Sequence, residues 1–252
     1  MRKEKIRIVF IGLIMFLLFA FTGQEKTKLF LLGDSITLQY SPFLENILGD
    51  HFEIKKKAGT AEAFKNLDIP KGANGENSRM VLNYLKSQLA DPSFHPDLML
   101  LNCGLHDIKR DKQTNVIAID SEEYKQNLLE ISEILRQRNI RFIWVRTTEV
   151  VDSIHRKNPQ FNRFAKDLDL YNSIADSVFK MKQVPVIDLY SITKKMVNQR
   201  YVDHVHYNDE VKKQQAAFIA GFIINLVKSF YINKLFVCYG YMQITGKSCL
   251  FC

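Results

Sequence analysis

Short apolar runs alternate with amphipathic segments along most of this chain of 252 residues. The runs predict buried strands, and apolar positions that recur at helical spacing predict helices packed against them. The expected strands lie at 28–32, 52–57, 97–103, 140–148 and 184–190, and the expected helices at 41–48, 78–89, 121–138, 167–182 and 208–230. This order predicts an α/β fold with three layers, α/β/α, around a flavodoxin-like parallel sheet.

Polar residues mark the expected starts of the helices. Ser78, Ser121 and Asn208 stand where helical spacing begins, and Ser and Asn are common N-caps. The polar segment 155–162 is expected to be a loop.

The N-terminus has the pattern of a secretory signal. Basic residues precede an uninterrupted apolar run from Ile8 to Phe21, and small or polar residues follow it. The run is shorter than the roughly 20 residues of a membrane span, although an uncleaved anchor stays open as an alternative. We therefore expect a signal peptide or N-terminal anchor at 1–23, one domain at 24–231, and an extension of unknown role at 232–252. The expected location is secreted, periplasmic or at the cell envelope.

The charge of the chain does not suggest binding to nucleic acid. The formal net charge is +8, and residues 1–7 contribute +3 of it (four basic residues against Glu4), so the remainder carries +5. The basic residues are scattered and are not interleaved with aromatic ones. We expect no nucleic-acid partner, and a membrane contact only if the N-terminal segment is retained.

The four cysteines give no functional signal. Cys103 lies in an apolar run and is expected to be a buried thiol, while Cys238, Cys249 and Cys252 lie near the C-terminus. A single C-x-x-C pair without a second one is a weak indication of a metal site.

Polar residues gather directly after the expected strands and before the closing helix. These segments are 33–35, 104–107 and 202–209, together with Gly75 before the second main helix. In an open α/β sheet such segments share the edge at which ligands bind. Ser35 can therefore be a helix N-cap or a nucleophile, and the tripeptide Gly33-Asp34-Ser35 alone favours the cap.

The segment Asp203 to His206 supplies the partners that a nucleophilic serine needs. A hydroxyl attacks only when a base takes its proton and a third group orients the base. The spacing allows the carboxylate of Asp203 to reach Nδ1 of His206 while Nε2 faces Ser35. This convergence favours the nucleophile over the cap.

Acyl transfer also needs donors that face the developing oxyanion. The candidates are the backbone N–H groups of Ser35 and Gly75 and a side chain from residues 104–107. Gly75 is preferred to its rival Gly59 because an N–H at a helix start is free and lies in a favourable dipole.

Four ordered motifs resemble those of the SGNH/GDSL hydrolase family. They are GDS at 33–35, NGENS at 74–78, GLHD at 104–107 and DHVH at 203–206, and the resemblance spans residues 28 to about 230. It implies the same three-layer fold, an esterase, lipase or acetyl esterase activity, and no cofactor. It also implies that Ser35 is the nucleophile, His206 the base, Asp203 its orienting group and Gly75 an oxyanion donor.

One position departs from the family pattern. The family usually has G-x-N-D, in which the Asn amide donates to the oxyanion, and here His106 takes that place. A neutral imidazole donates from one nitrogen and a protonated one from both. We therefore hypothesise that His106 is the third oxyanion donor.

Other polar residues near these motifs have structural interpretations. Asp34 and Asp107 are expected to order the loops at the edge of the sheet, and Asn77 to line it. His204 is the nearest rival to His206 but does not match the family position. A metal site formed by Asp203, His204, His206 and Asp209 is the less favoured alternative, so no metal is expected.

Three functions remain open from the sequence. The preferred one is a secreted serine esterase that acts on a small-molecule or carbohydrate ester, with an acetylated carbohydrate as the substrate suggested by the family. The second is an O-acyltransferase that uses the same serine. The third is a non-catalytic glycan-binding or envelope module, which only the His106 replacement supports. The oligomeric state is not predicted.

Overall fold

A computed structural model describes residues 25–59, 72–158, 160–196 and 199–245, with the backbone alone from 230 to 245. The predicted signal segment therefore lies outside the described residues, as do Cys249 and Cys252. Among the helices described, none is both long and apolar enough to cross a membrane.

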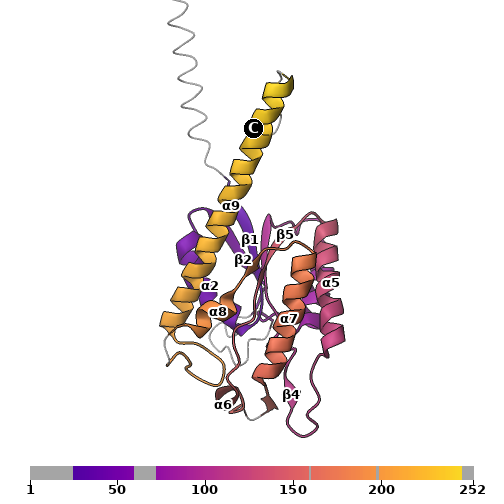
Figure 1. Cartoon of the computed structure of the whole chain (residues 1–252), viewed down its shortest axis with the longest axis vertical. Helices are drawn as coiled ribbons and strands as arrows, with labels where there is room; N and C mark the ends of the chain where they lie inside the picture. Colours follow the sequence, from indigo (N-terminus) through magenta and orange to yellow (C-terminus); the bar gives the residue numbers. More distant parts are fainter. Residues whose placement is uncertain (1–24, 60–71, 159, 197–198, 246–252) are drawn as a thin grey trace, which may run out of the picture.

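A parallel five-stranded sheet forms the centre of the fold, in the order β2-β1-β3-β5-β7 (Figure 1). The strands are β1 (Thr27–Leu32), β2 (Phe52–Lys56), β3 (Leu98–Leu101), β5 (Arg141–Val145) and β7 (Val186–Ile187). This is the flavodoxin-like order, so the predicted fold class is confirmed. The order reverses between β1 and β3, and the loops after these two strands therefore flank the position where ligands bind in such sheets.

Helices cover both faces of the sheet. On one face α9 (Asp209–Thr245) packs against α2 (Ser35–Leu48) and α8 (Leu189–Lys194). On the other, α5 (Ser121–Gln137) packs between α4 (Ser78–Leu89) and α7 (Ala165–Met181) (Figure 1).

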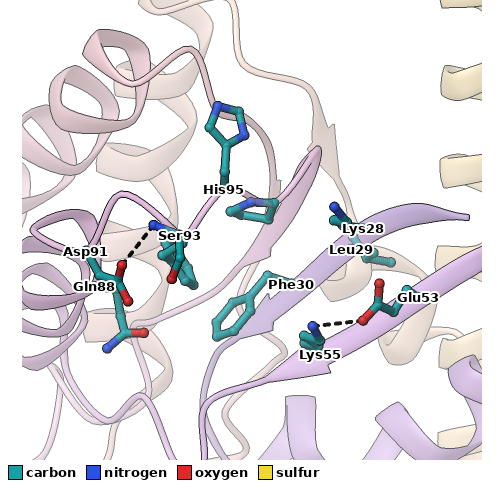
Figure 2. Close-up of a pocket in the computed structure, with 11 residues that line it drawn as sticks. Lys28, Leu29, Phe30, Glu53, Lys55, Gln88, Asp91, Ser93 and His95 are labelled. Carbon is teal, nitrogen blue, oxygen red and sulfur yellow. Dashed lines mark hydrogen bonds and ion pairs between the residues drawn. The ribbon is translucent and has the colours of Figure 1, made fainter. Parts of the chain in front are cut away.

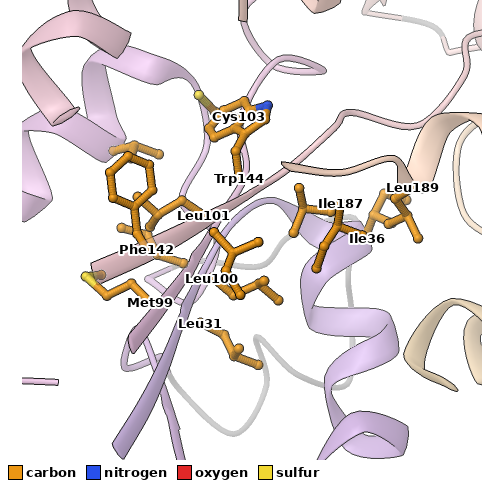
Figure 3. Packing of buried hydrophobic residues seen from close by; sticks show 14 of the residues in the cluster. Leu31, Ile36, Met99, Leu100, Leu101, Cys103, Phe142, Trp144, Ile187 and Leu189 are labelled. Carbon is orange, nitrogen blue, oxygen red and sulfur yellow. The ribbon is translucent and has the colours of Figure 1, made fainter. Parts of the chain in front are cut away.

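The core fills the space between the sheet and its helices. Most residues of β1, β3 and β5 are buried, including all of β3, and Trp144 of β5 is fully enclosed (Figure 3). The Trp144 ring packs against that of Phe179 of α7, with centroids 4.5 Å apart. Strands buried on both faces appear in the sequence as continuous apolar runs, which explains why they were recognisable.

Several predicted element boundaries are wrong. The N-caps of α4 and α5 are Asn77 and Asp120, one residue before the predicted Ser78 and Ser121. The segment expected to be a loop contains the end of α6 (Asp152–His155) and β6 (Phe161–Asn162), which pairs with β4 (Arg110–Asp111). Helix α9 continues to Thr245, beyond the predicted end of this helix at residue 230.

Helix α2 begins six residues earlier than predicted and contains Pro42. Proline lacks the N–H that would bond to the carbonyl of Leu38 in a regular helix. The Ser41 hydroxyl donates to that carbonyl at 3.1 Å instead. Because this bond replaces the missing one, the helix runs without interruption from Ser35 into the core.

Candidate active site

The predicted nucleophile lies on the turn that joins β1 to α2. Asp34, not Ser35, is the N-cap of α2, and its Oδ1 accepts the N–H of Ile36 at 2.9 Å. Ser35 is the first helical residue, and its side chain is therefore available for another partner. A Cβ on Gly33 would collide with the Thr37 side chain, which explains why this tight turn needs glycine.

Ser35, His206 and Asp203 form one hydrogen-bonded chain. Nε2 of His206 lies 3.0 Å from Oγ of Ser35, and Nδ1 lies 2.6 Å from Oδ2 of Asp203. Ser35 and His206 are buried, with 6% and 5% of their surface exposed. The structure thus brings together residues that are 171 positions apart, in the contacts that a nucleophile, its base and an orienting carboxylate require.

Asp203 is held as a carboxylate by the turn that carries it. Burial by itself would raise the pKa of Asp203, but the backbone N–H groups of His206 and Val205 and the His206 ring outweigh it and lower this pKa below its usual value. Both backbone bonds, each 2.7 Å long, go to Oδ1. Oδ2 is therefore left to accept from the imidazole.

The turn from Asp203 to His206 is fixed at both ends. Tyr201 and Tyr207 form an antiparallel bridge, and their rings stack with centroids 4.9 Å apart. The N–H of Tyr207 donates to Oε1 of Gln39 on α2 at 3.3 Å. This contact ties the loop that carries His206 to the helix that carries Ser35.

The predicted oxyanion donors are only partly available. The N–H of Gly75 donates to the carbonyl of Gly33 at 2.7 Å, so the expectation that it is free is wrong. A Cβ on Gly75 would lie 2.9 Å from the same carbonyl oxygen. Among the hydrogen bonds of the described residues, none uses the N–H of Ser35. Gly59, the predicted alternative to Gly75, lies at the edge of the undescribed segment 60–71 and packs against Ala73.

His106 faces an amide from the neighbouring motif. Oδ1 of Asn74 accepts the N–H of Glu76 at 2.7 Å, which leaves its Nδ2 facing Nε2 of His106 at 3.5 Å. A donor in this position favours the tautomer with its proton on Nδ1. Burial, followed by the charges of Lys109 and Arg163, holds the pKa of His106 well below its usual value, so the ring is neutral at pH 7. Its role as an oxyanion donor stays a hypothesis.

The other predicted rim residues hold loops together. Asn77 accepts the N–H of Met80 at 3.0 Å as the N-cap of α4. Asp107 is fully buried, and its Oδ1 accepts the N–H of Ser78 at 2.8 Å, which joins the segment 104–107 to the start of α4. Burial raises the pKa of Asp107 to about 6.

His204 does not compete for Ser35. Its Nε2 lies 3.0 Å from Nδ2 of Asn158, and its ring faces Phe161. Within the described parts of the chain, no group of three His, Cys, Asp or Glu side chains is arranged to hold a metal ion. The alternative of a metal site around His204 and Asp209 therefore has no support.

Two basic side chains beside the motif 104–107 were missed by sequence analysis. Nε of Arg163 donates to the carbonyl of Leu105 at 2.6 Å, and Lys109 lies four residues farther along. Both lie against the ring of Phe161. Single basic residues in loops carry no pattern in the sequence, and only the fold brings them together.

A cavity elsewhere in the molecule contains none of these groups. It has a volume of about 260 Å³ and lies between the first half of β1, the strand β2 and the segment before β3, lined by Lys28, Lys55 and His95 among others (Figure 2). Because Ser35 lies at the carboxyl end of β1, this cavity is not the candidate active site.

Comparison with protein families matches residues 31–213 to the GDSL-like lipase/acylhydrolase family. The chain belongs to this family. The match covers well over half of the chain and includes all four motifs, which confirms the resemblance to SGNH/GDSL hydrolases. Membership in this acylhydrolase family supports an ester-hydrolysing enzyme. No curated protein matches the chain.

Solved structures of GDSL-type hydrolases share the fold. A putative acylhydrolase from Bacteroides fragilis is 17% identical, with a TM-score of 0.59 over 81% of this chain and 89% of that one. An acetyl xylan esterase is 17% identical, with a TM-score of 0.57 over 78% and 99%. A lipase/acylhydrolase from Enterococcus faecalis is 18% identical, with a TM-score of 0.57 over 78% and 95%. At these identities the likeness shows the fold alone.

Proposed function

We propose that this protein is a serine esterase in which Ser35 is the nucleophile. Nε2 of His206 takes the proton of the Ser35 hydroxyl as its oxygen attacks the ester carbonyl, and then gives it to the leaving alcohol. Water, activated by the same nitrogen, releases the acid from the acyl-enzyme. Asp203 keeps the imidazole in the tautomer that accepts from Ser35.

The contact of 3.0 Å between Ser35 Oγ and His206 Nε2 carries the proposal. If Ser35 only began a helix, that role would not require its hydroxyl to contact an imidazole whose other nitrogen is bound to a carboxylate. The N–H of Ser35 at the start of α2 is the donor best placed to stabilise the oxyanion, because the helix dipole adds to it. We expect a second donor from Asn74 or His106, or from Gly75 if its bond to Gly33 opens.

The substrate class is proposed by analogy with the family. An acetyl ester of a carbohydrate is the expected substrate, since one protein of the same fold is an acetyl xylan esterase. The apolar N-terminal run supports the proposal that the enzyme acts outside the cytoplasm, secreted or at the envelope.

The first experiment is hydrolysis of p-nitrophenyl acetate and longer homologues by the full chain. Turnover should vanish in Ser35→Ala and persist in Ser173→Ala, a matched change at an exposed serine on α7. A phosphonate inhibitor should form an adduct on Ser35. No turnover and no adduct would refute the esterase and favour the binding module, whereas acyl transfer to an added sugar in place of hydrolysis would favour the acyltransferase.

A further inference from the structure

Arg163 is a buried cation. Its side chain is enclosed, with 3% of the residue exposed, and within the described chain it makes no ion pair. Its only hydrogen bond there is from Nε to the carbonyl of Leu105, and Nη1 is buried with no partner. Burying a charge without a counter-charge is costly, so such a group calls for an explanation.

A second cation lies on the same aromatic ring. Nζ of Lys109 lies 4.5 Å from the ring centroid of Phe161, and Cζ of Arg163 lies 4.7 Å from it. Lys109 is half-buried, and it too makes no ion pair among the described residues. Burial, with the repulsion of Arg163 added, lowers the pKa of Lys109 to about 8. Two cations held together in this way would be stabilised by an anion that both contact.

These cations lie beside the proposed catalytic groups. The carbonyl that holds Arg163 belongs to Leu105, the residue next to His106. The ring of Phe161 faces that of His204 at 6.4 Å, and His204 in turn faces His206 at 6.2 Å. Lys109, Arg163 and His206 all act electrostatically on His106, so the two cations lie in the same group of loops as the triad.

The nearest structural explanation accounts for only part of this arrangement. Asp34 attracts Arg163 electrostatically, but the two do not form an ion pair, and Oδ1 of Asp34 is used to cap α2. Glu76 and, more weakly, Asp34 attract Lys109, but each does so less than Arg163 repels it. Neither carboxylate forms an ion pair with Lys109 or Arg163.

We propose that Arg163 and Lys109 form a subsite for a negatively charged group, a carboxylate or a phosphate, carried by the ester substrate. This inference rests on the proposed esterase function and narrows its substrate to an anionic ester. The guanidinium is suited to a planar, two-point contact, and Lys109 adds a point charge at the more open side.

Matched esters test the proposal on each side of the scissile bond. Monomethyl succinate carries its carboxylate on the acyl side, and dimethyl succinate is its neutral counterpart. O-acetylated methyl galacturonoside carries a carboxylate on the alcohol side, with the acetylated galactoside as counterpart, and acetylated glycerol phosphate replaces the carboxylate by a phosphate. The expected result is a kcat/KM at least about tenfold higher for one anionic ester than for its neutral counterpart, as one charge-assisted contact provides.

The ratio of kcat/KM for the anionic ester to kcat/KM for its neutral counterpart should fall to near one in Lys109→Gln and in Arg163→Gln. Lys112→Gln removes one positive charge from an exposed position on the same segment and should leave the ratio unchanged. Because Arg163→Gln alters a buried group, Lys109→Gln keeps the test valid if that variant fails to fold.

Two outcomes separate this inference from the esterase proposal. Equal hydrolysis of every anionic ester and its counterpart by the wild type would overturn the subsite and leave the esterase intact. If no ester is hydrolysed, calorimetric titration of Ser35→Ala with galacturonate and with inorganic phosphate decides: binding that Lys109→Gln abolishes supports the subsite, and no binding overturns it.

Discussion

Replacing Asp203 by asparagine is the sharpest test of the proposed triad. In the wild type Oδ1 accepts two backbone N–H groups, and Oδ2 accepts from Nδ1 of His206 at 2.6 Å. In Asp203→Asn the amide oxygen can keep both backbone bonds, so we expect the turn to stay folded. The amide nitrogen, a donor, then faces Nδ1.

The substitution therefore reverses the tautomer of the imidazole. Nδ1 must accept, the proton moves to Nε2, and Nε2 can no longer accept the proton of Ser35 across 3.0 Å. The corresponding change in a Ser-His-Asp protease lowers kcat about 10⁴-fold. We expect a loss of that order here, which corresponds to about 5 kcal/mol of transition-state stabilisation.

The assay is kcat for p-nitrophenyl acetate in the wild type, in Asp203→Asn and in a matched control. Asp209→Asn is the control, because it removes an exposed carboxylate three residues beyond His206. The carboxylate of Asp209 contacts Lys212. A surface pair of this kind is worth less than about 1 kcal/mol, so activity should be retained. A loss of less than about tenfold in a folded Asp203→Asn protein would refute the role assigned to Asp203.

Three further predictions follow from the loops around the site. In His106→Asn we expect kcat/KM for p-nitrophenyl acetate within about tenfold of the wild type, since an amide also donates. The pH profiles of the two proteins should coincide above pH 6, because the lowered pKa of His106 keeps its ring neutral there. Divergence of the profiles above pH 6 would contradict this. Burial raises the pKa of Asp107 from 3.8 to about 6, so the folded state loses stability as the pH rises from about 4 towards 6 and above. The loss is up to about 3 kcal/mol for a pKa shift of this size. Asp107→Asn should remove that dependence in denaturant unfolding at pH 4 and pH 7, and an unchanged dependence would point to another group. Gly33→Ala should lower the free energy of unfolding by about 1–3 kcal/mol, because its Cβ meets the Thr37 side chain, and an unaltered urea midpoint would count against this crowding.

The central strands of the sheet could be predicted from the sequence because they are buried on both faces. Leu98 to Leu101 has no polar alternation, and such a run flanked by helical patterns has few other interpretations. The ends of helices were harder to predict, because adjacent polar residues compete for the cap. Asn77 and Ser78 are both good N-caps, and only the backbone path selects the first.

Part of the candidate site could be predicted because segments that follow parallel strands lie at the same edge of the sheet. This rule led to the expectation that Ser35 and His206 meet, although their catalytic roles remain a proposal. It does not determine which N–H groups stay free, and the bond from Gly75 to Gly33 depends on the approach of two loops. Arg163 could not be predicted for a similar reason, because nothing in its sequence neighbours indicates that it will bond to the carbonyl of Leu105 in the segment 104–107.

Helix α9 links the site to a distant point of the molecule. It begins three residues after His206 and continues for 37 residues, so at 1.5 Å per residue its two ends are about 55 Å apart. Its far end projects beyond the opposite side of the sheet from the triad (Figure 1). Immobilising the protein on a bead or sensor chip through Thr245 would therefore leave the end of the sheet that carries the triad facing the solvent, whereas attachment through the segment 104–111, which lies beside the triad, would turn that end towards the support.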